Sequence, residues 1–181
     1  MHAGRYDQAE AVFREAVAIH PGSVELTYQL ADSLLAQSKV QDARPLLERA
    51  RESHPASPLP YLGLMSVAKR DGDPRRALIL ADDAASRIAI SDYDGHFALA
   101  ERLVDFPERR IQFEYHLRTA AAGLRRSAMP HMLLAALLED TDRAEATRQL
   151  AAGRRLWKGP DFDHTMDELR QLLQTKAAEG G

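Results

Sequence analysis

Apolar residues recur with helical spacing through the first half of the chain. The segment from residue 24 to 38 carries them at intervals of three and four, which places them on one helical face. They are Leu26, Leu30, Ala31, Leu34 and Leu35. Ser23 precedes the segment as a candidate N-cap, and a second periodic segment over about 41–53 stops before Pro55, because proline removes a backbone donor and blocks the preceding turn. The pattern predicts a helical hairpin.

The hairpin pattern repeats with a period of 34 residues. Small residues recur at two positions of the second helix, large residues recur at others, and a His-Pro pair follows it. The matching sets are Ala9, Ala43 and Ala77; Ala16, Ala50 and Ala84; Phe13 and Leu47; Leu30 and Leu64; Pro21 and Pro55. Gly4, Ser38 and Gly72 align at the predicted turn between helices. Such a period is the signature of a repeat architecture in which stacked units share one core.

The second half is less regular. Residues 88–95 break the pattern, and Asp92 or Asp94 is a candidate cap for the helix that follows. We expect helices over about 96–104, 107–126, 131–139, 142–158 and 163–176. A capping pattern of Asp142 and Glu145 opens the fourth of these helices, and Asp163 caps the last. The inward face of the 107–126 helix is predicted to hold Ile111, Phe113 or Tyr115, Leu117, Ala120, Ala121 and Leu124. The chain is therefore divided into residues 1–91, with regular repeats, and residues 92–181, with degenerate hairpins and a C-terminal capping helix.

The repeat resembles the tetratricopeptide repeat (TPR) family over about residues 4–91. The resemblance rests on the 34-residue period, on alanine where two helices approach closely, and on the segment Gly-Arg-Tyr-Asp-Gln-Ala-Glu-Ala from Gly4 to Ala11. Ala81 stands where the family has a large residue, and Ala89 stands where the third proline would be. The resemblance implies an all-α fold, a right-handed superhelix (solenoid) of TPR-like hairpins. It also implies a protein–protein interaction scaffold.

The first unit contains only the second helix of its pair, because Gly4 already lies at the expected turn. A second helix without its partner exposes an apolar face. Two interpretations follow. We favour the one in which the chain is a fragment of a longer repeat protein. In the other, a later helix, a second copy of the chain or a partner covers that face.

Composition adds mostly exclusions. With 30 Ala, 24 Leu and 6% aromatic residues, the chain favours helices over strands. It has no Cys, so thiolate catalysis and Cys-ligated metal sites are excluded. A net charge of −3 argues against nucleic-acid binding. No signal peptide or membrane-spanning run is visible, which favours the cytoplasm weakly and predicts no membrane insertion.

Candidate catalytic and metal-binding residues have simpler explanations. His164 lies among Asp161, Asp163 and Asp167, but aspartates at a helix start are typical caps. Phosphate-binding glycine loops and nucleophile motifs are absent from the sequence. We therefore expect no catalytic residues, no metal site and no cofactor.

The family geometry implies that first helices line a concave surface. The residues expected to face it are Glu25, Tyr28, Asp32, Leu35, Leu59, Leu62, Ser66, Lys69 and Arg70. The chain contains no Asn, so the carboxylate clamp of some family members is not expected. We predict a groove for a peptide or a protein partner. Two alternatives stay open: a targeting or regulatory repeat module of a larger enzyme or assembly complex, and a module that self-associates through its incomplete first repeat.

Overall fold

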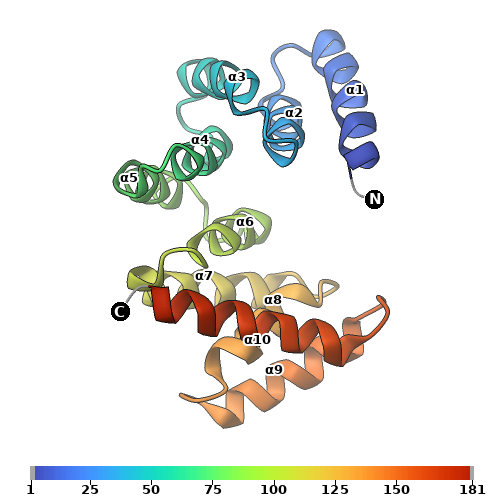
Figure 1. Ribbon diagram of the computed structural model, residues 1–181, viewed down its shortest axis with the longest axis vertical. Helices are drawn as coiled ribbons and strands as arrows, with labels where there is room; N and C mark the ends of the chain where they lie inside the picture. The colour runs from blue at the N-terminus through green and yellow to red at the C-terminus, as the bar shows by residue number, and fades with distance from the viewer. Residues whose placement is uncertain (1–2, 180–181) are drawn as a thin grey trace. The chain divides into compact units, whose positions relative to one another are not determined.

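The computed structural model describes residues 3–179, and within them the ordered elements are all helices. The chain forms two compact units, residues 1–88 and residues 89–181. The first contains α1 (Ala3–Ile19), α2 (Val24–Ala36), α3 (Val40–Ser53), α4 (Leu59–Arg70) and α5 (Pro74–Ala85). Each of these helices packs on the next, and α2 also packs on α4 (Figure 1). The predicted all-α fold of helical hairpins is confirmed.

The two hairpins turn through the same backbone geometry. Ser38 has a φ of 61° and Gly72 a φ of 74°, and these residues are one repeat period apart. The left-handed conformation carries no steric penalty for glycine and a modest one for serine. The left-handed turn at Ser38 follows the end of α2 at Ala36, which is two residues before the predicted end of this helix. The third aligned residue, Gly4, lies inside α1, so the turn predicted there was wrong.

Alanine allows the paired helices to approach closely. Ala43, Ala77 and Ala84 are fully enclosed, and Ala50 is 6% exposed. A second close approach joins α3 to α4, where a Cβ atom placed on Gly63 would lie 2.5 Å from Leu47 Cδ2. Leu47 is itself fully buried, so its side chain has little room to move. Small residues therefore set the spacing of the helices on both sides of α3.

An ionic clamp recurs between neighbouring hairpins. The Glu10 carboxylate of α1 accepts hydrogen bonds from Lys39 Nζ at 2.7 Å and Gln37 Nε2 at 2.9 Å. One period later, Arg44 Nη2 of α3 lies 2.8 and 2.7 Å from the two carboxylate oxygens of Asp71. Gln37 and Asp71 are the C-cap residues of α2 and α4. The clamp therefore joins equivalent positions in the two repeats, but the acidic residue is on the second helix in one repeat and at the end of the first helix in the other.

The contacts of Glu10 lower the pKa of its carboxyl group. The hydrogen bond from Lys39, followed by that from Arg14, lowers the pKa of Glu10 to about 2. A depressed carboxyl pKa stabilises the fold above the unfolded value, and this contribution is lost as the pH falls towards 2. The clamp therefore holds α1 to the α2–α3 turn across the physiological pH range.

The second unit follows the same plan. It contains α6 (Tyr93–Leu103), a 3₁₀ helix η1 (Pro107–Arg109), α7 (Arg110–Gly123), α8 (Met129–Leu138), α9 (Arg143–Leu156) and α10 (Phe162–Glu179). The side chains of Asp92 and Asp142 cap α6 and α9 by accepting from the backbone N–H three residues on, as predicted. Helix α10 packs on α8 and η1 (Figure 1), and its buried residues are Phe162, Met166 and Leu169.

Three predictions for this unit were wrong. Ile111 is 87% exposed, because it lies about 200° around α7 from the buried Phe113, on the opposite side of the helix. Helix α7 ends at Gly123 instead of about residue 126. Asp161 caps the last helix in place of Asp163, since its carboxylate accepts from the His164 N–H at 3.0 Å. Helix α10 extends to Glu179, three residues beyond the predicted end, and residues 180–181 lie outside the described residues.

Gly63→Ala should destabilise the first unit by about 1 kcal/mol, because overpacking against Leu47 exceeds the gain of about 1 kcal/mol in helix propensity. Urea unfolding followed by circular dichroism measures the change. Gly22→Ala is the matched control, since a Cβ there would meet nothing within 4 Å. It should be neutral or slightly stabilising. An increase in stability for Gly63→Ala would contradict the close approach of α3 and α4.

Arg44→Glu should lower the free energy of unfolding by about 0.5–1 kcal/mol, since it opposes Asp71 and the pair is partly exposed. The double variant Arg44→Glu with Asp71→Arg should recover most of this loss, because it copies the polarity of the Glu10–Lys39 clamp. A double-mutant cycle in urea gives the coupling energy. A coupling of zero would show that the observed geometry adds nothing to stability.

Candidate partner-binding site

The nine residues predicted for the concave surface lie on α2 and α4. These helices contact one another, and both pack on α3. Equivalent members of the set are 34 residues apart, so Glu25 corresponds to Leu59 and Asp32 to Ser66. The structure thus brings the two halves of the predicted set side by side.

Two of the nine residues belong to the core. Leu35 is 2% exposed and Leu62 is completely buried. Because α2 and α4 lie against each other and against α3, apolar side chains at the edges of their shared face are enclosed. Leu35 and Leu62 therefore offer no surface to a partner, which corrects the prediction that they face the concave surface.

The other seven residues form what we name the α2/α4 face. Glu25, Asp32, Lys69 and Arg70 are exposed, whereas the remaining three are half-buried: Tyr28, Leu59 and Ser66. The charges are separated, with both carboxylates on α2 and both cations at the end of α4. A partner lying across both helices would therefore meet an acidic side and a basic side.

Hydrogen bonds hold both ends of this face. Arg70 Nη2 donates to the Leu35 carbonyl oxygen at 3.1 Å, which ties the end of α4 to the last turn of α2. A cation is favourable there, because unpaired carbonyl groups make a helix C-terminus electronegative. At the other end, Ser23 Oγ donates to Glu25 at 3.0 Å and accepts from the Leu26 N–H, which caps α2. The charged edges of the face are thus attached to rigid helix ends.

The cavities of the two units lie elsewhere. In the first unit an open cavity of about 250 Å³ lies between α1, α2 and α3, with Val17, Thr27 and Leu46 in its wall. In the second unit a cavity of about 300 Å³ is lined by residues that include Phe106, Phe113 and Lys176. Both are mainly apolar and were missed by the sequence reasoning, because each is formed by residues from three or more elements.

Comparison with known sequences finds a family match for the first part of the chain. The profile of the tetratricopeptide repeat family matches residues 1–68. This match makes the first repeats of the chain similar to tetratricopeptide repeats. A search of curated proteins gave no match. The repeat period, the alanine contacts and the turn geometry of the first unit are thus those of TPR hairpins.

Solved TPR structures share the fold over nearly the whole chain. TTC0263, a thermophilic TPR protein of Thermus thermophilus, has a TM-score of 0.65 and 22% identity, over 94% of this chain and 92% of its own. YrrB, described as a TPR protein with an unusual peptide-binding site, has a TM-score of 0.60 and 16% identity, over 93% of this chain and 88% of its own. In the APC/C hetero-tetramer Cut9–Hcn1, the matching chain has a TM-score of 0.61 and 12% identity. There the match covers 99% of this chain and 37% of that one.

The TPR fold is that of a protein–protein interaction module, and TPR proteins are typically scaffolds without catalysis. In residues 3–179, no helix is both long and apolar enough to cross a membrane. The acidic cluster near His164 is occupied by other contacts: Asp161 caps α10, Asp163 pairs with Arg154, and Asp167 pairs with Arg170 at 2.9 Å. Of these residues only Asp161 acts as a cap, while Asp163 and Asp167 form ion pairs.

A buried histidine pair in the second unit was not predicted. His96 of α6 and His116 of α7 are 3% and 5% exposed, and their Nδ1 atoms are 2.7 Å apart. Tyr115 contacts both rings edge-on. One signal could have revealed His116, since it falls on the same helical face as Phe113, Leu117 and Ala120.

The geometry of the histidine pair does not allow both rings to be charged. One Nδ1 donates a proton to the other, so both imidazoles must be neutral or share a single charge. Burial, followed by the neighbouring His96, lowers the pKa of His116 to about 4, and burial lowers the pKa of His96 as well. His96 Nε2 has no hydrogen-bond partner in the structure. Enclosure on this scale gives the pair a structural role in the α6–α7 hairpin.

The pair predicts an acid-sensitive second unit. The histidines of the unfolded chain become protonated as the pH falls below their ordinary pKa of about 6.5. In the folded protein His116 stays neutral until the pH reaches about 4. The free energy of unfolding should therefore decrease as the pH falls from 6.5 to 4. Urea unfolding followed by the fluorescence of Trp157, the only tryptophan, reports this unit.

His116→Gln should flatten that pH dependence, because glutamine can keep a hydrogen bond to His96 but does not titrate. His20→Gln, at an exposed site on the first unit, is the control and should leave the dependence unchanged. If His116→Gln retains the full wild-type slope, the buried pair is not its source.

Proposed function

We propose that the α2/α4 face binds a peptide or protein partner and that the chain acts as a scaffold without catalysis of its own. The observation that carries the proposal is the pairing of an acidic α2 with a basic α4 end on one rigid surface, with Tyr28 and Leu59 half-buried beside them. Apolar contacts provide affinity, whereas separated charges fix the direction of a bound segment and speed its association.

The family supports this proposal at the level of fold. TPR proteins bind proteins or peptides, and the neighbour YrrB is described as having a peptide-binding site. The Cut9–Hcn1 neighbour belongs to a multi-protein assembly. We extend only the general role to this chain, and we place it on the first helices because their outer residues are polar and varied while their inner residues form the core.

Tyr28→Ala and Lys69→Glu test the face. Each should reduce capture of the partner from a lysate of the source organism by about tenfold, since a contact with a desolvated aromatic or ion pair contributes about 1.4 kcal/mol or more. Quantitative mass spectrometry of the captured proteins gives the measurement. Binding that is unchanged by both substitutions would refute the proposal.

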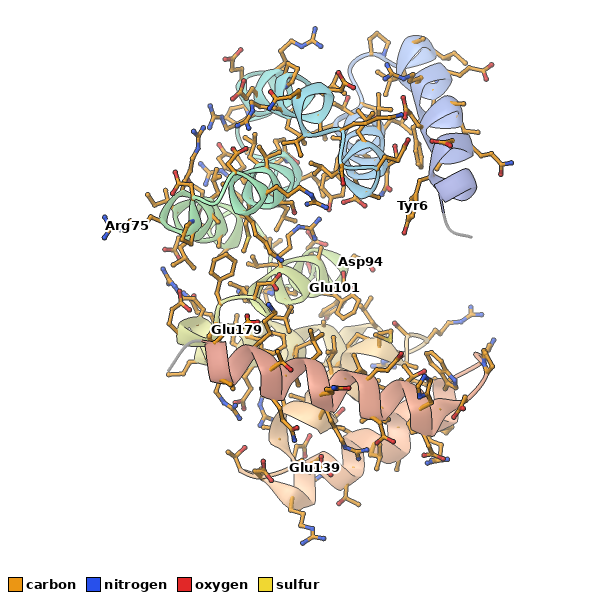
Figure 2. The ribbon with its side chains drawn as sticks, in the orientation of Figure 1. Tyr6, Arg75, Asp94, Glu101, Glu139 and Glu179 are labelled. Atoms are coloured by element: carbon orange, nitrogen blue, oxygen red, sulfur yellow. The ribbon has the colours of Figure 1, made fainter. Side chains whose placement is uncertain are left out.

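Arg75→Glu is the matched control for charge. Arg75 is an exposed cation on α5, and Figure 2 shows it directed away from the other helices of its unit. It should leave capture unchanged. Sedimentation of the purified chain tests the self-association alternative. If the chain alone forms a dimer and Lys69→Glu dissociates it, the molecule bound at the α2/α4 face is a second copy of the chain.

A further inference from the structure

The cavity of the first unit lies where the next repeat has a tyrosine. This cavity of about 250 Å³ is lined by residues of α1, α2 and α3, and Thr27 of α2 is one of them. One period later, Tyr61 of α4 occupies the equivalent position, and its side chain is only 6% exposed. The two repeats therefore build the same place with side chains of very different size.

In the next repeat two large side chains close this place. The Tyr61 ring centre lies 4.1 Å from the guanidinium carbon of Arg87, and the Tyr61 hydroxyl donates to the Pro55 carbonyl oxygen at 3.2 Å. Arg87 Nε donates to the same oxygen at 2.8 Å. One period before Arg87 the chain has Ser53, which lines the cavity. The cavity thus lacks both of the side chains that fill its counterpart.

The loop that carries the proline has the same hydrogen bonds in both repeats. The His20 N–H donates to the Ala16 carbonyl at 2.9 Å, and the Ser23 N–H donates to the His20 carbonyl at 3.1 Å. The corresponding distances one period later are 2.9 and 3.0 Å. Pro21 is therefore the counterpart of Pro55 in structure as well as in sequence. Within residues 3–179, its carbonyl oxygen accepts no hydrogen bond.

The rest of the wall is apolar or already bonded. The Thr27 hydroxyl donates to the Ser23 carbonyl at 2.9 Å, and the Ser53 hydroxyl donates to the Arg49 carbonyl at 2.8 Å. The Pro21 carbonyl is thus the wall acceptor that a ligand can use. The apolar side chains of the wall are Val17, Val24, Leu46 and Ala50.

The cavity results from residue identity and not from a helix that is missing. The side chains that close its counterpart come from α4 and from the residues just after α5. Their own counterparts are α2 and the end of α3, and both are among the described residues. At these two places the chain has threonine and serine where the next repeat has tyrosine and arginine.

We propose that this cavity is a binding site for a phenol ring, which takes the place that the Tyr61 side chain has in the next repeat. The ring lies against the apolar wall, and its hydroxyl donates to the Pro21 carbonyl oxygen. The volume is sufficient, because an apolar cavity of about 150 Å³ already holds a benzene molecule. The site is separate from the α2/α4 face and goes beyond the function proposed for that face.

The free molecule p-cresol is the probe, because it is the side chain of tyrosine without its backbone. Titration followed by NMR of the isotope-labelled protein should give saturable shifts of the Val17, Thr27 and Ser53 amides, with a dissociation constant of about 1 mM or lower. Toluene, which lacks the hydroxyl, should bind about three- to tenfold more weakly, since the Pro21 carbonyl then gains no donor.

A third probe distinguishes the two sources of a phenol ring. N-acetyltyrosinamide carries the ring on a backbone with two amide groups. If it shifts the same signals as p-cresol, the cavity admits a tyrosine of a polypeptide. If only p-cresol binds, the ligand is a free phenol. Either result supports the site.

The double variant Thr27→Tyr with Ser53→Arg copies the closed place of the next repeat. It should weaken p-cresol binding by about tenfold or more, because the new ring occupies the same volume, and it should raise the urea midpoint of the first unit. Thr175→Tyr is the matched control, since Thr175 is an exposed threonine of α10 that does not line the cavity. It should leave the affinity unchanged. Circular dichroism checks that the variants are folded, and the set of shifted amides locates the ligand without them.

Three results would overturn the proposal. They are the absence of saturable shifts with p-cresol, a folded double variant that binds p-cresol as tightly as the wild type, and shifts confined to Phe106 and Phe113, which line the cavity of the second unit. Lys69→Glu should bind p-cresol normally, because Lys69 does not line the cavity. The phenol site can therefore fail while the proposed function stands, and the reverse also holds.

Discussion

The close approach of two helices at an alanine is the contact on which the rest of the first unit depends. Ala43 and Ala77 have no exposed surface, and larger side chains at these points would force each hairpin apart. Gly63 applies the same constraint between hairpins, against Leu47. Once these distances are set, the larger apolar residues on each side meet at packing distance and form a continuous core. The 34-residue spacing of the alanines is the sequence record of this geometry.

Polar contacts follow the same period, and their interruption coincides with the boundary between the units. Glu10 and Arg44 occupy equivalent positions and bind the C-cap region of the following first helix with opposite charges. The next equivalent position holds Leu78, which cannot form an ion pair. Asp105, the counterpart of Asp71, lies 3.5 Å from Lys176 of α10 instead. The clamp therefore joins neighbouring hairpins of the first unit, whereas Asp105 binds α10 within the second unit.

Much of the fold could be predicted from the sequence, because helix periodicity and caps are local signals. The hairpins and the capping roles of Ser23, Asp92 and Asp142 were found in this way. The errors arose where tertiary contacts decide. Leu62 lies on a helix side that α3 and α2 together enclose, which one helix cannot reveal. For the same reason the binding face could be assigned to α2 and α4 only as a set, and the buried pair of His96 with its partner on α7 was missed.

In a repeat array each helix buries its apolar face against a neighbouring helix. The exposed fraction of the side chains on that face therefore shows whether the neighbour is present. Alanines that are enclosed in α3 and α5 are only half-buried in α1, although the local sequence is equivalent. The difference cannot come from propensity or side-chain size, since the residue types at these positions are the same. It comes from the helix that covers α3 and α5, whose counterpart does not lie among the described residues. The α2/α4 face has a different chemistry. Both of its helices already pack on neighbouring helices, so only polar or half-buried side chains are left to contact a ligand. A TPR unit can thus offer two surfaces of different chemistry, one that continues its core and one that recognises a partner on its rim.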